Sequence, residues 1–233
     1  MNLSDKIKNY VMSDQTLNLV KNTDLLLVAG VVSAGKDTTV NELLKSDRYY
    51  NIISHTTRQP RENHGILERD TYDYFFVDLA EAEHMVDDQA FIETKYVHGN
   101  VYGTSAIELQ RAHDQQRVAV TDIDIEGVIE YLDVKPETHA VFLLPPSVET
   151  WLRRLTRRYG DLSVVTEELD KRFANARDEI TKAKNDQRFI MVVNDDLMTT
   201  VKRIQAIVDG AQDQTSDYAL EVADHLLDYL NSR

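Results

Sequence analysis

The stretch of this chain with the clearest chemical meaning runs from Leu25 to Thr38. An apolar run ends at Gly30, four residues follow, and the pair Gly35-Lys36 begins a predicted helix. Gly-x-x-x-x-Gly-Lys is the spacing of a phosphate-binding loop, in which backbone N–H groups and a helix N-terminus face a polyphosphate. Lys36 would reach the outer phosphates. The next position departs from the usual pattern, because Asp37 replaces a hydroxyl residue and Thr38 follows it.

The segments that must position this loop alternate between strands and helices. Short apolar runs predict strands over residues 24–30, 49–54, 117–121, 139–144 and 189–193. Apolar residues at helical spacing follow Lys36 and recur within residues 3–21, 104–114, 126–132, 147–183, 196–208 and 217–230. This alternation predicts an α/β fold of the P-loop NTPase type, with a parallel sheet flanked by helices.

Residues 55–104 differ from the rest of the chain. A polar and basic loop is followed by an apolar stretch at 72–77, a short predicted helix at 79–86, a strand at 91–97 and a glycine-bearing turn at 98–100. We expect a small lobe inserted into the main sheet. Three histidines, His55, His64 and His98, have no consistent ligand spacing, so they are expected on the surface or in loops.

The composition excludes several classes of protein. The chain of 233 residues has a net charge of −14, which argues against general binding to nucleic acid or an anionic membrane. It has no cysteine, so disulfides and thiolate metal sites are excluded. No apolar run approaches the ~18–20 residues that span a bilayer, and no secretory signal is visible. We expect a cytoplasmic protein without nucleic-acid or membrane partners, either a monomer or a homodimer.

Five further blocks, together with the loop, resemble the guanylate kinase family in their order and spacing. They cover roughly residues 24–209 and are Ser54-His55-Thr56-Thr57-Arg58-Gln59-Pro60-Arg61, Glu93 with Val97–Thr104, Asp122–Val128, the arginines 154, 158 and 172, and Val193–Asp196. The resemblance implies a phosphotransferase that makes GDP from GMP or dGMP and ATP. It also implies a division into an N-terminal helical extension (1–23), core (24–54), inserted GMP-binding lobe (55–104), core (105–146), lid (147–183), core (184–210) and C-terminal helix (211–233).

Residue chemistry and the resemblance together assign an acceptor site. Arg58 and Arg61 lie three apart on one loop and could grip a dianionic phosphate through fork-shaped hydrogen bonds. Tyr74 and Tyr102 could donate their hydroxyls to the same phosphate. Guanine presents N1–H and amino donors, and the resemblance assigns the carboxylate of Glu93 to that edge. The remaining candidates for base recognition are Ser54, Thr104, and Asp122 or Asp124.

The donor site is assigned in the same way. The ATP phosphates would be held by Gly30, Val31, Val32, Ser33, Ala34, Gly35, Lys36, Asp37 and Thr38, with Asn194 bordering the adenine. Mg²⁺ would bridge two phosphates, oriented by Thr38 or Asp37. Lys36, Arg58 and the lid residues Arg154, Arg158 and Arg172 are the expected catalytic residues, because positioning and charge neutralisation dominate phosphoryl transfer.

The loop is the least faithful of the matched blocks. The family's loop usually reads Gly-Pro-Ser-Gly-x-Gly-Lys, whereas Val31, Val32 and Ser33 stand at its second to fourth positions. A residue with a Cβ at Ser33 is unfavourable if that position needs a positive φ. The loops at 62–71 and 159–165 also look longer than usual.

Two other functions stay open at this point. A ribose 1,5-bisphosphate phosphokinase shares the fold and resembles Gly35-Lys36-Asp37 and Glu62-Asn63-His64, but Glu93, Arg61 and residues 122–128 suit a guanine nucleotide better. A non-catalytic guanylate kinase-like binding domain would have lost the loop and lid chemistry, which this sequence retains.

Overall fold

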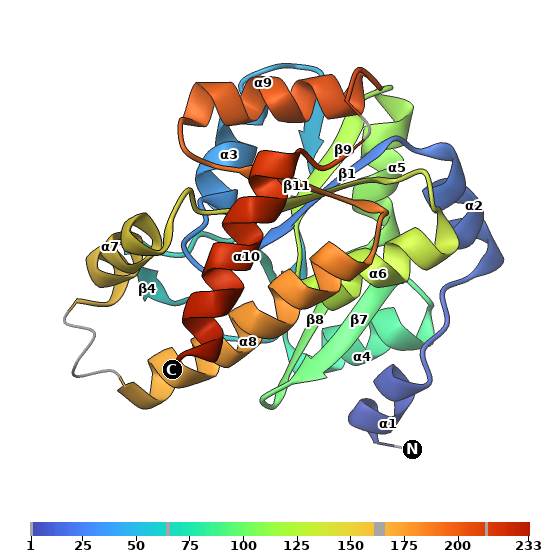
Figure 1. The fold of residues 1–233 in the computed structure, drawn as a ribbon. Helices are drawn as coiled ribbons and strands as arrows, with labels where there is room; N and C mark the ends of the chain where they lie inside the picture. The colour runs from blue at the N-terminus through green and yellow to red at the C-terminus, as the bar shows by residue number, and fades with distance from the viewer. Residues whose placement is uncertain (1, 64–65, 161–165, 213) are drawn as a thin grey trace. The chain divides into compact units, whose positions relative to one another are not determined.

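The computed structural model describes residues 2–63, 66–160, 166–212 and 214–233, and its contacts divide the chain into two compact units (Figure 1). One unit comprises Met1–Asp24 with Asp47–Thr121, and the other comprises Leu25–Ser46 with Asp122–Arg233. The first unit therefore includes more of the chain than the expected lobe of residues 55–104. Among the described residues, no helix has both the length and the apolar character needed to cross a membrane.

The second unit is built on three parallel strands. They are β1 (Leu25–Gly30), β10 (His139–Leu144) and β11 (Phe189–Val193), with Val28 opposite Val141 and Val141 opposite Ile190. Nearly every side chain on them is buried, as expected where helices cover both faces of a parallel sheet. The predicted α/β class with a parallel sheet flanked by helices is confirmed.

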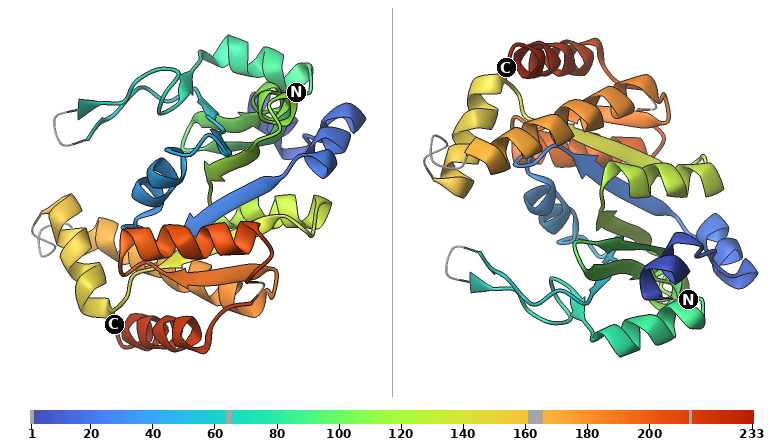
Figure 2. Two further views of the ribbon diagram at one scale, coloured as in Figure 1. Left: turned by 90° about the horizontal axis from the view of Figure 1, so that it is seen from above. Right: turned by 90° about the horizontal axis from the view of Figure 1, so that it is seen from below.

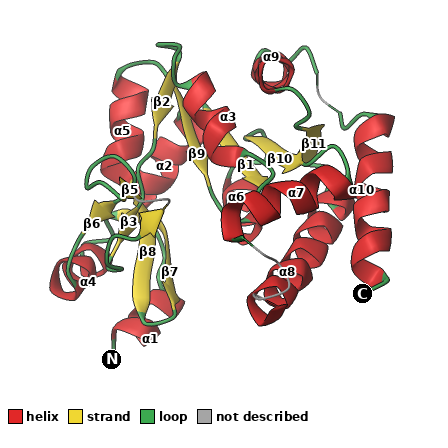
Figure 3. Ribbon diagram, turned by 90° about the vertical axis from the view of Figure 1, so that its left-hand side faces the viewer, coloured by secondary structure: helices red, strands yellow, loops and turns green. Residues whose placement is uncertain are grey.

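Two groups of helices cover these strands (Figure 3). The helices α3 (Lys36–Leu43) and α9 (Leu197–Val208) contact each other on one face. On the other face lie α6 (Ile125–Val134), α8 (Thr166–Asn185) and α10 (Asp217–Asn231), while α7 (Val148–Tyr159) contacts α10. The C-terminal helix α10 runs beside α8, as both Figure 1 and Figure 2 show.

The first unit holds two separate sets of strands. β2 (Tyr49–Asn51) pairs in parallel with β9 (Val118–Asp122). A mixed sheet has the order β6 (Phe75–Phe76), β3 (His55–Thr56), β8 (Asn100–Ser105) and β7 (Phe91–Val97). The two-residue strands β4 (Glu62–Asn63) and β5 (Ile66–Leu67) form a small hairpin.

Helices from both ends of this unit pack on the mixed sheet. They are α1 (Leu3–Lys8), α2 (Asp14–Asn22), α4 (Leu79–Asp87) and α5 (Ala106–Asp114). Ile7 joins Phe91 and Val101 in one buried apolar cluster, and the Tyr10 hydroxyl hydrogen-bonds both the N–H and the C=O of Phe91. The N-terminal helices are therefore a packed part of this unit.

The structure corrects four details of the sequence prediction. β2 ends at Asn51 rather than at residue 54, and residues 100–105 form β8 before a helix that begins at Ala106 rather than at 104. The sequence does not predict β8 because Gly103 lies within it and glycine is unfavourable in strands. In the structure a Cβ at this position would lie 2.7 Å from the Phe91 ring, so only glycine fits. His55 is half-buried and stacks on Phe75 at 4.7 Å between ring centroids, whereas His98 lies exposed in the turn as expected. His64 lies outside the described residues.

Candidate functional site

The loop between β1 and α3 has the backbone shape that its glycines predict. Gly30 has a φ of +147°, and a Cβ there would lie 2.5 Å from the carbonyl oxygen of Leu143. Gly35 has a φ of +99°, and its Cβ would lie 2.4 Å from Nδ2 of Asn194. Ser33 has a φ of 61°, so the position where the family's glycine is lost does adopt the left-handed conformation.

Side chains from distant elements hold this loop by its carbonyl groups. The Trp151 indole N–H donates to the carbonyl of Val32 at 2.8 Å, and the Asn194 amide donates to that of Ala34 at 2.8 Å. Asn194 is almost fully buried and also accepts a hydrogen bond from Thr200. The amide of Asn194 is therefore engaged in fixing the loop.

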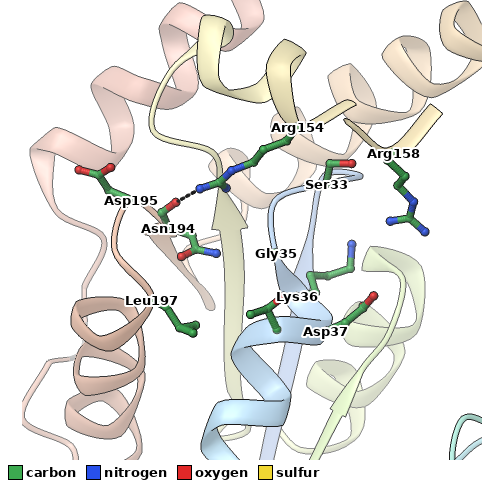
Figure 4. Close-up of a pocket in the computed structure, with 10 residues that line it drawn as sticks. Ser33, Gly35, Lys36, Asp37, Arg154, Arg158, Asn194, Asp195 and Leu197 are labelled. Carbon is green, nitrogen blue, oxygen red and sulfur yellow. Dashed lines mark hydrogen bonds between the residues drawn. The ribbon is translucent and has the colours of Figure 1, made fainter. Parts of the chain in front are cut away.

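The loop forms one wall of a cavity of about 380 Å³. Residues from α3, α7 and the end of β11 surround it, as Figure 4 shows: Ser33, Gly35, Lys36, Asp37, Thr38, Arg154, Arg158, Asn194, Asp195 and Leu197. The structure thus brings together most of the predicted donor-site residues and two of the three predicted lid arginines.

Two of the cavity cations hydrogen-bond main-chain carbonyl oxygens. Lys36 Nζ donates to the carbonyl of Gly30 at 2.6 Å. The Arg154 guanidinium donates to the carbonyl of Asn194 at 2.9 Å and to that of Ala34 at 3.3 Å. Burial lowers the pKa of Arg154, although nearby Asp195 acts in the opposite direction. A phosphate entering here would offer both cations a charged acceptor in place of neutral ones.

Acidic groups lie beside the same lysine. The pKa of Asp122 is raised, first because surrounding protein atoms disfavour its charged form and then because of the negative charge of Asp37, against an opposing effect of Lys36. Glu179 on α8 has its pKa raised to about 7, mainly by burial, against an opposing effect of Lys36. Glu179 therefore belongs to this charged group. The sequence does not identify it as a site residue, because it lies in no recognised motif.

The third lid arginine is held away from the loop residues. Arg172 forms an ion pair with Glu168 at 2.7 Å, and its guanidinium lies 4.7 Å from the centroid of the Tyr159 ring. Arg158, which lines the cavity, lies 5.7 Å from the same ring. Arg172 is not among the described residues that line the cavity. Most of the predicted long loop between α7 and α8 lies outside the described residues.

In the first unit, the loop after β3 is pinned to β8. Thr56 Oγ1 donates to the carbonyl of Val101 at 3.1 Å and accepts from the backbone N–H of Arg58 at 3.2 Å. Thr57 Oγ1 accepts from the N–H of Val101 at 2.9 Å. The paired threonines of the sequence block therefore fix the backbone that carries Arg58.

Arg58 is surrounded by the two predicted tyrosines and by a carboxylate. Its guanidinium lies 5.3 Å from the centroid of the Tyr74 ring, which meets the Tyr102 ring edge-on at 6.4 Å. Glu68 accepts two hydrogen bonds from this guanidinium, at 2.8 and 3.1 Å. Arg61, in contrast, has an exposed side chain and meets Glu68 through its backbone N–H at 2.8 Å.

The candidate base-reading residues form a second group on the same sheet. Glu93 on β7 lies opposite Thr104 on β8, and the Thr104 hydroxyl donates to Glu93 Oε1 at 2.8 Å. The Ser54 hydroxyl lies 3.4 Å from that of Thr104. A carboxylate fixed beside two hydroxyls is a suitable reader for a base edge that presents hydrogen-bond donors.

The two other predicted acceptor residues belong to the second unit. Asp124 is the N-cap of α6, where its carboxylate accepts from the N–H of Gly127 at 2.7 Å. Asp122 lies with Asp37 and Lys36. Ser54, Glu93 and Thr104 belong to the first unit.

A glycine-bearing loop at the carboxyl end of a parallel strand, with a lysine and two arginines around one cavity, defines an α/β protein built to bind a polyphosphate. A sequence model of the family described as guanylate kinase matches residues 22–211. The chain belongs to the guanylate kinase family.

Individual relatives agree with this family. The guanylate kinase of Clostridioides difficile is 32% identical over 200 residues, covering 85% of this chain and 93% of the relative. That of Alkalilimnicola ehrlichii is 37% identical over 185 residues, covering 78% of this chain and 86% of the relative. A crystal structure of guanylate kinase from Anaplasma phagocytophilum superposes with a TM-score of 0.59 and 26% identity, covering 85% of this chain and 90% of that one.

Proposed function

We propose that this chain transfers the γ-phosphoryl group of ATP to GMP or dGMP, giving ADP and the guanosine diphosphate. The acceptor assignment rests on one observation, the hydrogen-bonded group of Ser54, Thr104 and Glu93. Its carboxylate is oriented so that it could accept hydrogen bonds from a base. Adenine has an acceptor at N1 and no 2-amino group, so it would offer this carboxylate no matching donors and bind poorly.

The residues of this chain act mainly by placing charge. Lys36, Arg154 and Arg158 around the cavity would bind the donor phosphates and stabilise the charge that develops on the transferred group. Arg58, beside the Tyr74 and Tyr102 rings, would hold the acceptor phosphate. Arg172 would join the donor side by exchanging Glu168 for phosphate when the lid moves.

A divalent metal fits the donor site chemically. Asp37 and Asp122 place two carboxyl groups close together, and the raised pKa of Asp122, due first to burial and then to the charge of Asp37, is consistent with a site that gains from a cation. Oxygen ligands of this kind suit Mg²⁺, and Thr38 lines the cavity together with Asp37. We propose that Asp37, Thr38 and Asp122 hold Mg²⁺, which neutralises phosphate charge when bound.

We also propose that the protein acts in the cytoplasm, as a monomer or homodimer, without a nucleic-acid or membrane partner. A net charge of −14 supports this, since such a chain repels polyanions and anionic lipid. Size-exclusion chromatography with light scattering would distinguish the two oligomeric states.

A coupled assay of ADP release tests the function directly. GMP, dGMP, AMP, UMP and ribose 1,5-bisphosphate are supplied separately with ATP and Mg²⁺, and we expect release with the first two only. Release with ribose 1,5-bisphosphate but not GMP would contradict the proposal. GMP binding without turnover would identify a non-catalytic binding domain.

A further inference from the structure

The Arg58 guanidinium in the first unit has an unusual distribution of hydrogen bonds. A guanidinium carries five N–H donors in a fixed plane. Nη1 uses both of its donors, on Glu68 Oε2 at 2.8 Å and on the carbonyl of Gln59 at 2.7 Å. Nη2 uses one, on Glu68 Oε1 at 3.1 Å. Two donors are left, one on Nε and one on Nη2, and they lie side by side on one edge of the plane.

Leaving these two donors without a hydrogen-bond acceptor lowers the stability of the protein. The Arg58 side chain is only 9% exposed, and its Nε is buried without a hydrogen-bond partner among the described residues. A buried donor that makes no hydrogen bond costs stability, and more so on a charged group. Adjacent parallel donors on a planar cation match two oxygens of a phosphate or carboxylate.

Glu68 is itself fixed in place. Its side chain is 14% exposed, and it accepts from the backbone N–H of Arg61 at 2.8 Å in addition to its two bonds from Arg58. Burial would raise the pKa of Glu68, but the bonds from Arg58 and Arg61 outweigh it, so the pKa is lowered and the carboxylate stays ionised. A charged carboxylate therefore sets the rotation of the guanidinium before any ligand arrives.

We propose that Glu68 is a positioning residue, which holds Arg58 by one fork so that the Nε–Nη2 edge stays available for the phosphate of the acceptor nucleotide. This inference rests on the proposed function, since it takes GMP as the acceptor. Glu68 acts through Arg58 and does not touch the nucleotide. Because the carboxylate and the phosphate use different edges, the two anions bind the arginine together rather than in competition.

A double-mutant cycle on binding tests this role. GMP and guanosine are titrated into wild type, Glu68→Gln, Arg58→Ala and the double variant by calorimetry, with ATP affinity and thermal unfolding as controls for folding. The glutamine has nearly the shape of the glutamate but places an N–H₂ group against the guanidinium donors. We expect Glu68→Gln to weaken GMP binding roughly tenfold, with guanosine and ATP binding changed less than twofold. In the Arg58→Ala background the same substitution should have no further effect on GMP binding.

Three results would overturn the proposal. The first is a GMP affinity that Glu68→Gln leaves unchanged. The second is tighter GMP binding in Glu68→Gln, which would make Glu68 a competitor of the phosphate. The third is a loss of GMP affinity from Glu68→Gln that is equal in the wild-type and Arg58→Ala backgrounds. If Glu68→Gln does not fold, Glu68→Asp, which keeps the charge but shortens the reach, replaces it in the same cycle, and the same results apply. Failure of wild type to bind GMP would overturn the proposed function together with this role, whereas normal wild-type binding with an unaffected variant would overturn this role alone.

Discussion

The donor and acceptor regions hold their cations in different ways. In the second unit, Lys36 and Arg154 donate hydrogen bonds to neutral carbonyl groups of the loop and its surroundings. In the first unit, Arg58 is held by the full negative charge of Glu68. A cation on a carbonyl loses little when a phosphate replaces that partner, whereas a buried ion pair is costly to separate. The donor loop is thus arranged to change partners on binding, and the acceptor arginine to keep its partner.

The largest expected effect on activity comes from removing Lys36, the lysine of the donor loop. Lys36→Met keeps most of the side-chain length but removes the charge, and we expect kcat to fall roughly 10²- to 10³-fold, because one charge-stabilising group is lost from the transition state. The KM for GMP should change less than twofold. Steady-state kinetics measure both, with Lys45→Met as the matched control, since Lys45 is an exposed lysine paired only with Glu42 in the described structure. A parallel loss of GMP affinity would show that the two regions are not independent.

The acidic group beside Lys36 predicts a pH-dependent effect on stability. Glu179 has a folded-state pKa of about 7 against 4.5 in a model peptide, so the folded protein retains a proton that the unfolded chain loses between these values. Wild-type stability therefore falls as pH rises through this window, by at most about 3 kcal/mol. Glu179→Gln mimics the protonated side chain and should be more stable than wild type at pH 8 but nearly equal at pH 5.

Thermal unfolding of the ligand-free protein at both pH values measures this difference. Glu167→Gln is the control, because Glu167 lies on the same helix but is exposed and paired with Lys171. A gain for Glu179→Gln that is equal at pH 5 and pH 8 would contradict the raised pKa.

The sequence predicts the second unit better than the first, for physical reasons. β10 and β11 are continuous apolar runs with clear ends, so their predicted bounds match the structure residue for residue. β8 was missed because Gly103 serves the packing of Phe91, a contact that local propensity does not report. Long buried strands depend on local apolar character, whereas short strands in the first unit depend on which distant partner they meet.

The same limit applies to the candidate site. The positive φ at Ser33 fits the resemblance to the family, whose loop has glycine at this position. The pairing of Arg58 with Glu68 was not foreseeable, since the long loop that follows holds several acidic residues and nothing in their order shows which one folds back. Of the two candidates Asp122 and Asp124, the carboxylate of Asp124 caps α6 in the structure, a role that depends on where the helix begins.

The lid provides a third prediction, of intermediate size. Arg172→Ala should lower kcat about tenfold or more, if its charge reaches the transferred phosphoryl group during turnover. Lys171→Ala is the control: it is the neighbouring cation with the same i,i+4 pairing to a glutamate, and it should change kcat less than twofold. Equal small effects of both variants, with folding intact, would show that Arg172 serves only its surface ion pair. Arg172 would then differ from Lys36 and Arg154, because a carboxylate would hold it without any role in catalysis.

The smallest effect separates backbone strain from ligand contact within the loop itself. Ser33 has a φ of 61°, and its buried hydroxyl has no hydrogen-bond partner among the described residues, so Ser33→Gly removes a strained Cβ and an unsatisfied group together. We expect the variant to be more stable by about 0.5–1 kcal/mol, reduced by the greater flexibility of glycine in the unfolded chain.

Gln116→Gly is the matched control, because Gln116 has a φ of 53° and is exposed and remote in sequence from the loop. Both variants should unfold at slightly higher temperature, but only Ser33→Gly should change the KM for ATP. A raised KM would mean that the serine hydroxyl compensates its strain by binding a phosphate, and a lowered one would mean that strain in the free loop weakens the donor site.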